Sequence, residues 1–175
     1  MAINITIWIR QWRLRWNWLY DVAGRNTGGD KEMSDYKGKT AITFGVFDLL
    51  HFGHFELFRR IRELVGPEGK VYVMLQIDES IAKYKPGCKS VYDFATRQNM
   101  IETLRTVDKA IPYDAVGVEA VKDVEFDLLV CGPEHTNERF QLLGKWCAEH
   151  GKQVVTLPRT EGISTTKLKG ILKGQ

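Results

Sequence analysis

Two histidines stand three positions apart where an apolar run gives way to a helical pattern. Residues 51–54 read His-Phe-Gly-His, shortly after the β-branched and apolar run 40–47. Side chains three apart lie on nearly the same face of a helix, so both imidazoles can point at one ligand. The first turn of a helix also presents unpaired N–H groups and the positive end of the helix dipole. We therefore predict that His51 and His54 donate hydrogen bonds to a phosphate group, and that Gly53 lets this ligand approach the backbone.

A second segment, near the carboxyl end of the chain, repeats the strand-loop-helix arrangement. Residues 159–166 read Arg-Thr-Glu-Gly-Ile-Ser-Thr-Thr. Ser164 is a residue type that caps helices, and Thr165 falls in the turn that follows. A guanidinium such as that of Arg159 can donate two parallel hydrogen bonds to phosphate oxygens. Capping alone accounts for Ser164, but two such helix N-termini in one chain predict a site that binds a triphosphate between them.

Four further cations are candidates for contact with an anionic ligand: Lys83, Lys85, Arg97 and Arg105. Single charges of this kind are more often solvated surface residues. Lys85 precedes a Pro-Gly pair on a predicted loop beyond a strand end, so we expect it to reach the ligand.

The elements that must position these residues alternate between two periodicities. Strands are predicted at 40–47, 70–77, 108–113, 125–131 and 153–157. Helices are predicted at 51–65, 93–106, 137–150 and 164–172. This alternation predicts an α/β fold, a single Rossmann-like domain in which a parallel sheet is flanked by helices on both faces. Ligands of such sheets bind beyond the carboxyl ends of the strands, where both polar segments fall.

Composition narrows the classes of protein that fit. The 175 residues suit one domain, and a hydrophobic content of 43% is sufficient for a sizeable core. A formal net charge of +3 provides no concentrated basic face, so we expect no nucleic-acid partner. The three cysteines, Cys88, Cys131 and Cys147, form no closely spaced pair. They indicate reduced thiols in a cytoplasmic protein rather than a zinc site.

The first 32 residues are expected to form an N-terminal extension that precedes a domain at 33–175. Codons for Thr27–Asp30 can spell a bacterial ribosome-binding sequence at a suitable distance ahead of Met33. We hypothesise that the native start is Met33. Residues 1–20 contain four tryptophans with interspersed arginines, which argues against a transmembrane helix. The alternatives for this segment are an amphipathic helix at a membrane surface and a folded part of the domain.

The two polar segments resemble those of the cytidylyltransferase family, and in particular those of the bacterial glycerol-3-phosphate cytidylyltransferases. The matching segments are Phe44–His54, Ile101–Asp108 and Leu157–Thr166, within a likeness that spans about Thr40–Leu172. The His-Phe-Gly-His tetrapeptide alone marks a wide nucleotidyltransferase superfamily, whereas the last segment is typical of cytidylyltransferases. The resemblance implies that CTP and a phosphorylated alcohol, in the first place glycerol 3-phosphate, give a CDP-alcohol and pyrophosphate. The substrate phosphate would attack the α-phosphorus of CTP directly.

The resemblance also implies which residues act in this reaction. His51 and His54 would stabilise the α-phosphate, and Lys85 and Arg159 complete the catalytic set. The nucleotide-binding residues would be Gly45, Val46, Phe47, Asp48, Gly53, Gly132, Thr160, Gly162, Ile163, Ser164 and Thr165. The substrate-binding residues would be Lys83, Arg97 and Arg105. No residue is assigned as a metal ligand, but Mg²⁺ or another divalent cation should accompany the triphosphate, and the family implies a homodimer.

Two positions depart from the family pattern. The family often has an acidic residue directly after the glycine of the fourth strand, whereas here Gly132 is followed by Pro133, with Glu134 as the candidate replacement. The substrate-binding lysine expected after the third strand has no clear counterpart at 119–120, although Lys122 is close. Two alternatives stay open: an adenylyltransferase that acts on FMN or a sugar phosphate, and a non-catalytic nucleotide-binding module.

Overall fold

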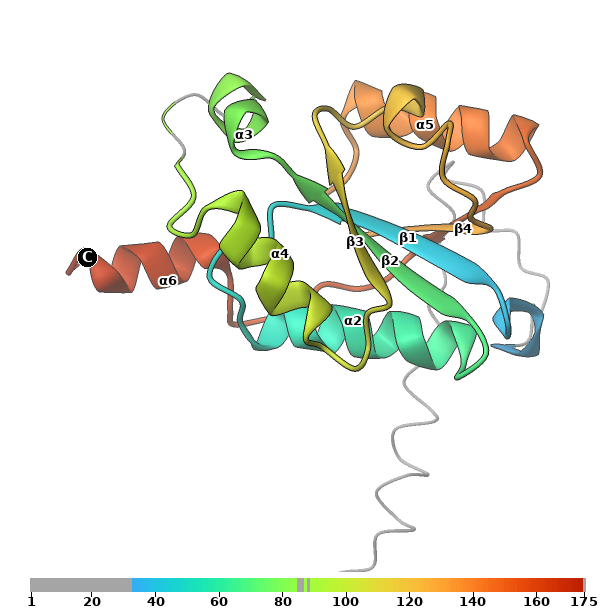
Figure 1. Ribbon diagram of the computed structural model, residues 1–175, viewed down its shortest axis with the longest axis horizontal. Coiled ribbons are helices and arrows are strands. Elements are labelled where there is room, and N and C mark those ends of the chain that lie inside the picture. Colours follow the sequence, from blue (N-terminus) through green and yellow to red (C-terminus); the bar gives the residue numbers. More distant parts are fainter. Residues whose placement is uncertain (1–32, 85–86, 88, 175) are drawn as a thin grey trace, which may run out of the picture.

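Five parallel strands form the centre of the protein, in the spatial order β3-β2-β1-β4-β5 (Figure 1). The computed structural model describes residues 33–84, 87 and 89–174. The strands are β1 (Thr40–Gly45), β2 (Lys70–Gln76), β3 (Lys109–Tyr113), β4 (Leu128–Cys131) and β5 (Gln153–Thr156). Strand β1 pairs in parallel with both β2 and β4, so the strand order reverses at the centre of the sheet. Ligands of open α/β sheets bind at such a reversal, outside the carboxyl ends of the strands.

Helices cover both faces of this sheet. They are α2 (Phe52–Val65), α3 (Asp78–Tyr84), α4 (Phe94–Glu102), α5 (Glu138–Glu149) and α6 (Thr165–Leu172), with the 3-10 turns η1 (Met33–Tyr36) and η2 (Val118–Ala120). Helices α2 and α4 lie on one face, and α5 lies on the other (Figure 1). The predicted α/β class, with a parallel sheet flanked by helices on both faces, is confirmed.

The alternation of side chains along the strands divides the core into two layers. Ile42 of β1 packs with Phe140 and Leu143 of α5 on one face of the sheet. The preceding residue, Ala41, points to the other face, where it packs with Ile61 of α2. Strand β1 is therefore buried on both faces, which accounts for its nearly continuous apolar sequence.

Helix α3 is the main difference between the predicted and the observed elements. The sequence pattern predicts no helix between 77 and 93, yet Asp78–Tyr84 is helical. A helix of 7 residues is too short to show a periodic apolar face in the sequence. Asp78 and Glu79 in its first turn and Lys83 in its last turn nevertheless complement the helix dipole.

Several predictions concern residues outside the described ranges. They are the extension at 1–32, the amphipathic interpretation of 1–20, and the position of Lys85. Within the described ranges, no helix combines the length and the apolar character that crossing a membrane requires. Cys131 and Cys147 are buried thiols, and burial raises the pKa of Cys147 to about 11, so this thiol is unreactive at neutral pH.

Candidate active site

The turn between β1 and α2 holds the two histidines at the start of a helix. His51 is the N-cap residue of α2, with extended backbone angles, and its Nδ1 accepts a hydrogen bond from the Gly53 N–H at 3.1 Å. A neutral imidazole that accepts at Nδ1 carries its proton on Nε2. His51 therefore caps α2 with one nitrogen and presents the other as a hydrogen-bond donor.

His54 lies against His51 inside the first turn of α2. The two rings stack, with centroids 3.8 Å apart and planes inclined by 19°. The His54 ring also contacts the Phe47 ring in an edge arrangement, with centroids 5.2 Å apart. The His54 Nδ1 is shielded from solvent and has no hydrogen-bond partner among the described residues. A shielded nitrogen is costly to leave unpaired, and unsatisfied groups of this kind are found at catalytic sites.

Both imidazoles are held in the neutral form. Burial lowers the pKa of His54 to about 3, and the neighbouring His51 contributes in the same direction. Burial also lowers the pKa of His51, together with the positive charge of Arg159. At neutral pH the two histidines can therefore act on an anion as hydrogen-bond donors rather than as cations.

The backbone that leads into this turn is strained at two positions. Phe47, with a φ of 51°, and Leu49, with a φ of 48°, adopt the left-handed region that side chains disfavour. Such a conformation costs about 1–2 kcal/mol per residue. The Phe47 ring is buried over Gly45, where an added Cβ would approach the ring to 2.7 Å. Strain of this kind is concentrated at functional sites, where the surrounding packing maintains it.

Helix α6 brings the second polar segment to the same edge of the sheet. Ser164 caps this helix, since its hydroxyl accepts from the Lys167 N–H at 3.1 Å. The hydroxyl of Thr165 donates to the backbone carbonyl of Asp48 at 3.0 Å. This bond joins the start of α6 to the turn that precedes α2, so the two helix N-termini lie close together.

A cavity of about 230 Å³ lies between these elements. The predicted residues that line it are His51, Gly53, His54, Gly132, Arg159, Thr160, Ile163, Ser164 and Thr165. They follow the carboxyl ends of β1, β4 and β5, at the reversal of strand order. The tertiary structure thus brings the two predicted phosphate-binding segments to one cavity, while the roles of the individual residues stay predictions.

Glu134 and His135 also line this cavity. The Nδ1 of His135 accepts from the Gly132 N–H at 2.9 Å, and its ring stacks on Phe140 with centroids 4.4 Å apart. The Glu134 carboxylate folds over Gly132, so a Cβ added there would have to displace it. Glu134 is a predicted candidate from the sequence, whereas His135 is not. The available signal was position, because both residues follow the predicted strand 125–131 after Gly132 and Pro133.

Arg97 is enclosed within the protein. Its side chain is 0% exposed, its Nη1 donates to the Val46 carbonyl at 2.7 Å, and its Nη2 pairs with Asp78 at 2.6 Å. The backbone carbonyls of Gln76 and Tyr92 accept further hydrogen bonds from this guanidinium. The network joins the ends of β1 and β2 to the start of α3. This geometry assigns Arg97 a positioning role, and its contact with a substrate phosphate stays a prediction.

The other predicted residues lie away from the described wall of the cavity. Arg105 is exposed and precedes β3, near the amino ends of the strands, whereas the cavity lies at their carboxyl ends. Lys83 is exposed at the end of α3, with its Nζ 4.8 Å from the centre of the Tyr84 ring. The carboxylate of Asp48 is buried and bonded within the protein. Four further predicted residues are absent from the described wall: Gly45, Val46, Phe47 and Gly162.

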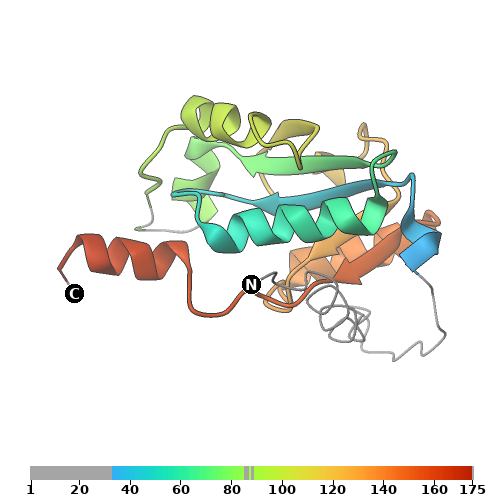
Figure 2. The same cartoon turned by 90° about the horizontal axis from the view of Figure 1, so that it is seen from below.

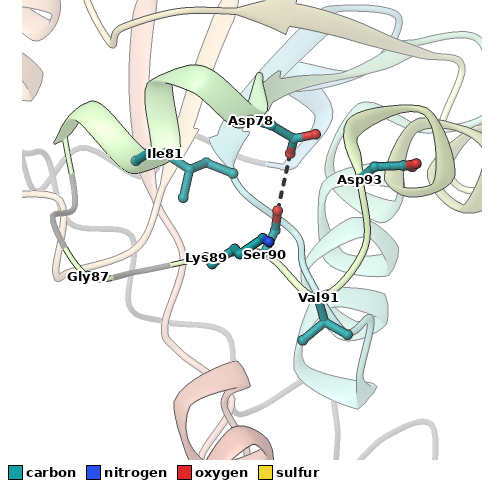
Figure 3. Close-up of a pocket in the computed structure, with 8 residues that line it drawn as sticks. Asp78, Ile81, Gly87, Lys89, Ser90, Val91 and Asp93 are labelled. Carbon is teal, nitrogen blue, oxygen red and sulfur yellow. Dashed lines mark hydrogen bonds between the residues drawn. The ribbon is translucent and has the colours of Figure 1, made fainter.

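A larger cavity of about 520 Å³ lies between α3 and the segment 89–93 (Figure 3). Ser90 and Asp78 line it, and the Ser90 hydroxyl donates to the Asp78 carboxylate at 3.1 Å. Neither histidine of the first turn of α2 lines this cavity, nor does Arg159. We therefore place the phosphate chemistry at the smaller cavity, where both histidines and Arg159 lie together.

The residues of the smaller cavity fit a divalent cation that arrives with a triphosphate. In the part of the chain that the structure describes, no three His, Cys, Asp or Glu side chains gather as a preformed metal site. Glu134 is the one carboxylate on the described wall. Mg²⁺ characteristically binds through one or two carboxylates together with substrate phosphates and water, which this wall can provide.

Comparison with known proteins agrees with this geometry. Residues 42–171 match the family model described as Cytidylyltransferase-like. The chain is 41% identical to Glycerol-3-phosphate cytidylyltransferase of Staphylococcus aureus, over 78% of this chain and 97% of the relative. It is 36% identical to the protein of the same name from Bacillus subtilis, over 78% of this chain and 98% of the relative. A solved structure of the lipopolysaccharide core biosynthesis protein from Thermoplasma volcanium shares the fold, with a TM-score of 0.56 at 23% identity, over 71% of this chain and 98% of that chain. The chain therefore belongs to the cytidylyltransferase-like family.

Proposed function

We propose that this protein transfers the cytidylyl group of CTP to glycerol 3-phosphate and releases pyrophosphate. The observation that carries the proposal is the stacked pair His51 and His54, which shares one cavity with Arg159 and the N-terminus of α6. Two relatives that match this chain over almost their whole length are named for this reaction. The geometry and the relatives support the proposal through the same residues, because the family match at 42–171 includes 51–54 and 159–166.

In the proposed reaction, a phosphate oxygen of glycerol 3-phosphate attacks the α-phosphorus of CTP. A new P–O bond forms, and the bond from the α-phosphorus to the oxygen that bridges to the β-phosphorus breaks. The electron pair of the broken bond leaves with pyrophosphate. Because no side chain becomes covalently attached to the nucleotide, catalysis consists of positioning the reactants and stabilising charge on the phosphoryl oxygens.

The two histidines supply neutral N–H donors where this charge develops. His51 carries its proton on Nε2, because its Nδ1 accepts from Gly53. His54 is neutral at neutral pH, because burial lowers its pKa to about 3. Hydrogen bonds to the phosphoryl oxygens lower the barrier if they are stronger in the five-coordinate transition state than in bound CTP. Arg159 and the N-terminus of α6 bind the phosphates that leave.

The proposal includes Mg²⁺ with the triphosphate, a cytoplasmic location and a homodimer. When it is bound, the ion neutralises charge on the leaving phosphates. Glu134 is the carboxylate of the described wall that would hold it, directly or through water. The buried thiols of Cys131 and Cys147 agree with a reducing compartment. Sedimentation analysis of the full chain tests the homodimer.

Pyrophosphate release measured with each nucleoside triphosphate tests the nucleotide. With glycerol 3-phosphate as the acceptor, we expect a kcat/KM for CTP at least about 100-fold above that for ATP. Glycerol 3-phosphate, FMN and a sugar phosphate, supplied in turn, test the acceptor, and mass spectrometry identifies the product. A preference for ATP would establish the adenylyltransferase alternative. Binding of CTP without turnover would establish a non-catalytic module. His54→Ala serves as the inactive control in the pyrophosphate-release assay.

A further inference from the structure

The carboxylate of Asp48 lies at the junction of three segments. It is 2% exposed and accepts hydrogen bonds from the backbone N–H groups of Val91 at 2.9 Å and Tyr92 at 3.2 Å. The same carboxylate pairs with the ammonium of Lys169, which belongs to α6, at 2.8 Å. The turn after β1, the segment before α4 and helix α6 therefore meet at one side chain.

Lys169 completes this junction from the side of α6. Its Nζ donates to the backbone carbonyl of Lys89 at 2.8 Å, in addition to its ion pair with Asp48. Thr165, four residues earlier and on the same face of the helix, donates to the backbone carbonyl of Asp48 at 3.0 Å. Helix α6 is thus fixed to Asp48 at two points, one at its first residue and one a turn later.

The Asp48 carboxylate is ionised at neutral pH. Burial would raise the pKa of Asp48, but the Lys169 ammonium and the N–H groups of Val91 and Tyr92 lower it overall. The carboxylate is almost fully enclosed, whereas the Lys169 side chain is 30% exposed. Removal of one partner from such a partly buried pair is more costly than removal from a surface pair, because the enclosed charge loses its compensation.

Apolar packing contributes little to the position of α6. The helix has no buried residue, and Ile171 and Leu172 at its end are 61% and 74% exposed. Figure 2 shows α6 extending away from the sheet rather than lying across it. The polar contacts of Thr165 and Lys169 therefore hold α6 itself against the turn after β1, while Ile163, just before the helix, lies close to Gly53 of α2.

We propose that Asp48 and Lys169 form a positioning pair that sets the N-terminus of α6 relative to His51 and His54. Neither member of the pair is among the described residues that line the cavity, so both act through the helix. The positioning role rests on one part of the proposed function, namely that a nucleoside triphosphate binds between the N-termini of α2 and α6. A displacement of about 1 Å at a reacting centre can lower a rate by about 100-fold.

Kinetics of Lys169→Met test the pair, because methionine removes the charge and retains much of the apolar length. We expect the KM for CTP to rise and kcat to fall, each by about tenfold. The KM for glycerol 3-phosphate should change by less than about twofold. Lys169→Arg should recover most of the lost activity, since a guanidinium also pairs with a carboxylate. Lys173→Met, which removes a charge from the exposed end of the same segment, should retain wild-type constants. Wild-type constants for Lys169→Met, or equal losses in Lys173→Met, would overturn the proposal.

A double-mutant cycle tests whether the two residues act together. Asparagine at position 48 has one acceptor oxygen and cannot replace every bond that the Asp48 carboxylate accepts. Asp48→Asn should therefore raise the KM for CTP as Lys169→Met does, and the double variant should be no worse than the poorer single variant. Fully additive losses would show that the residues act independently. If Asp48→Asn does not fold, the comparison of the three lysine variants decides the question.

A measurement on the nucleotide-free protein separates this inference from the proposed function. Amide hydrogen exchange across 165–172 should be faster in Lys169→Met than in the wild type or in Lys173→Met. A wild-type enzyme that uses ATP in place of CTP would refute the proposed function. The kinetic constants of the same variants, measured with ATP, would still test the positioning pair. Unchanged exchange across α6 would overturn the positioning pair with any substrate.

Discussion

The imidazole of His51 stacks on that of His54, with ring centroids 3.8 Å apart, and the two rings have different partners. The Nδ1 of His51 accepts from the Gly53 N–H and caps α2. The Nδ1 of His54 has no partner among the described residues. The protein therefore fixes the His51 ring by a hydrogen bond, whereas packing alone holds the His54 ring among the described residues, and substitutions can separate capping, protonation and binding.

Replacement of His51 by asparagine should separate helix capping from catalysis. Asparagine is a favoured N-cap residue, so its side chain can accept from the Gly53 N–H in place of Nδ1. We expect His51→Asn to lose turnover by about 100-fold or more, with a free energy of unfolding within about 0.5 kcal/mol of the wild type. His51→Ala should lose turnover equally and about 1 kcal/mol of stability in addition. Steady-state kinetics and urea denaturation measure the two effects, and a fully active His51→Asn would exclude a role for the Nε2 proton.

The low pKa of His54 predicts that stability falls in mild acid. The folded-state pKa is about 3, whereas the ordinary value is 6.5. Between these values the unfolded chain binds a proton that the native protein excludes, so the contribution is complete above about pH 6.5 and is lost as the pH falls. The slope is at most about 1.4 kcal/mol per pH unit. Urea denaturation between about pH 7 and pH 5 should give a shallower pH dependence for His54→Asn than for the wild type. Identical slopes would contradict the low pKa.

Arg97 and Arg105 should respond differently to substitution. Arg97→Met leaves the Asp78 carboxylate and the carbonyls of Val46 and Gln76 without their enclosed donor. Loss of one partner of a fully buried ion pair costs about 3–5 kcal/mol of unfolding free energy. Because the Asp78 side chain is 37% exposed, we expect Arg97→Met to cost less, about 2–3 kcal/mol. Arg105→Met, at an exposed position, should cost less than about 0.5 kcal/mol.

Equilibrium denaturation of both arginine variants provides the measurement. A stable Arg97→Met variant with a raised KM for the acceptor would favour direct substrate contact over a positioning role. A large loss of stability in Arg105→Met would mean that this exposed side chain has a structural partner.

Removal of divalent cations should abolish turnover without unfolding the protein. The ion is expected to bind with the triphosphate at the Glu134 wall, because the described residues form no three-ligand metal site. Excess EDTA should stop pyrophosphate release, and Mg²⁺ added beyond the chelator should restore it. The thermal midpoint of the nucleotide-free protein should be unchanged by EDTA. Turnover that persists in EDTA would remove the cation from the proposal, and a lowered midpoint would reveal a metal held by the protein alone.

Local sequence was sufficient to predict the strands and most of the helices. Strand β1 is buried on both faces, so it is apolar along nearly its whole length. Helix α2 buries Phe58, Ile61, Leu64 and Val65 at helical spacing, which the sequence shows directly. Helix α3 escaped prediction, because its 7 residues include only two buried ones, Ser80 and Ile81.

The sequence by itself determined where two candidate phosphate-binding segments lie, because an N-cap, its following turn and a nearby guanidinium are local features. Only the tertiary structure decided which charged residues face the cavity. Asp48 and Arg97 have side chains that suit a ligand, but both are enclosed by partners from other elements. Thr165 and Asp48 are 117 residues apart in sequence and 3.0 Å apart in space. Periodicity over a few residues cannot reveal such a contact, because the fold of the whole sheet creates it.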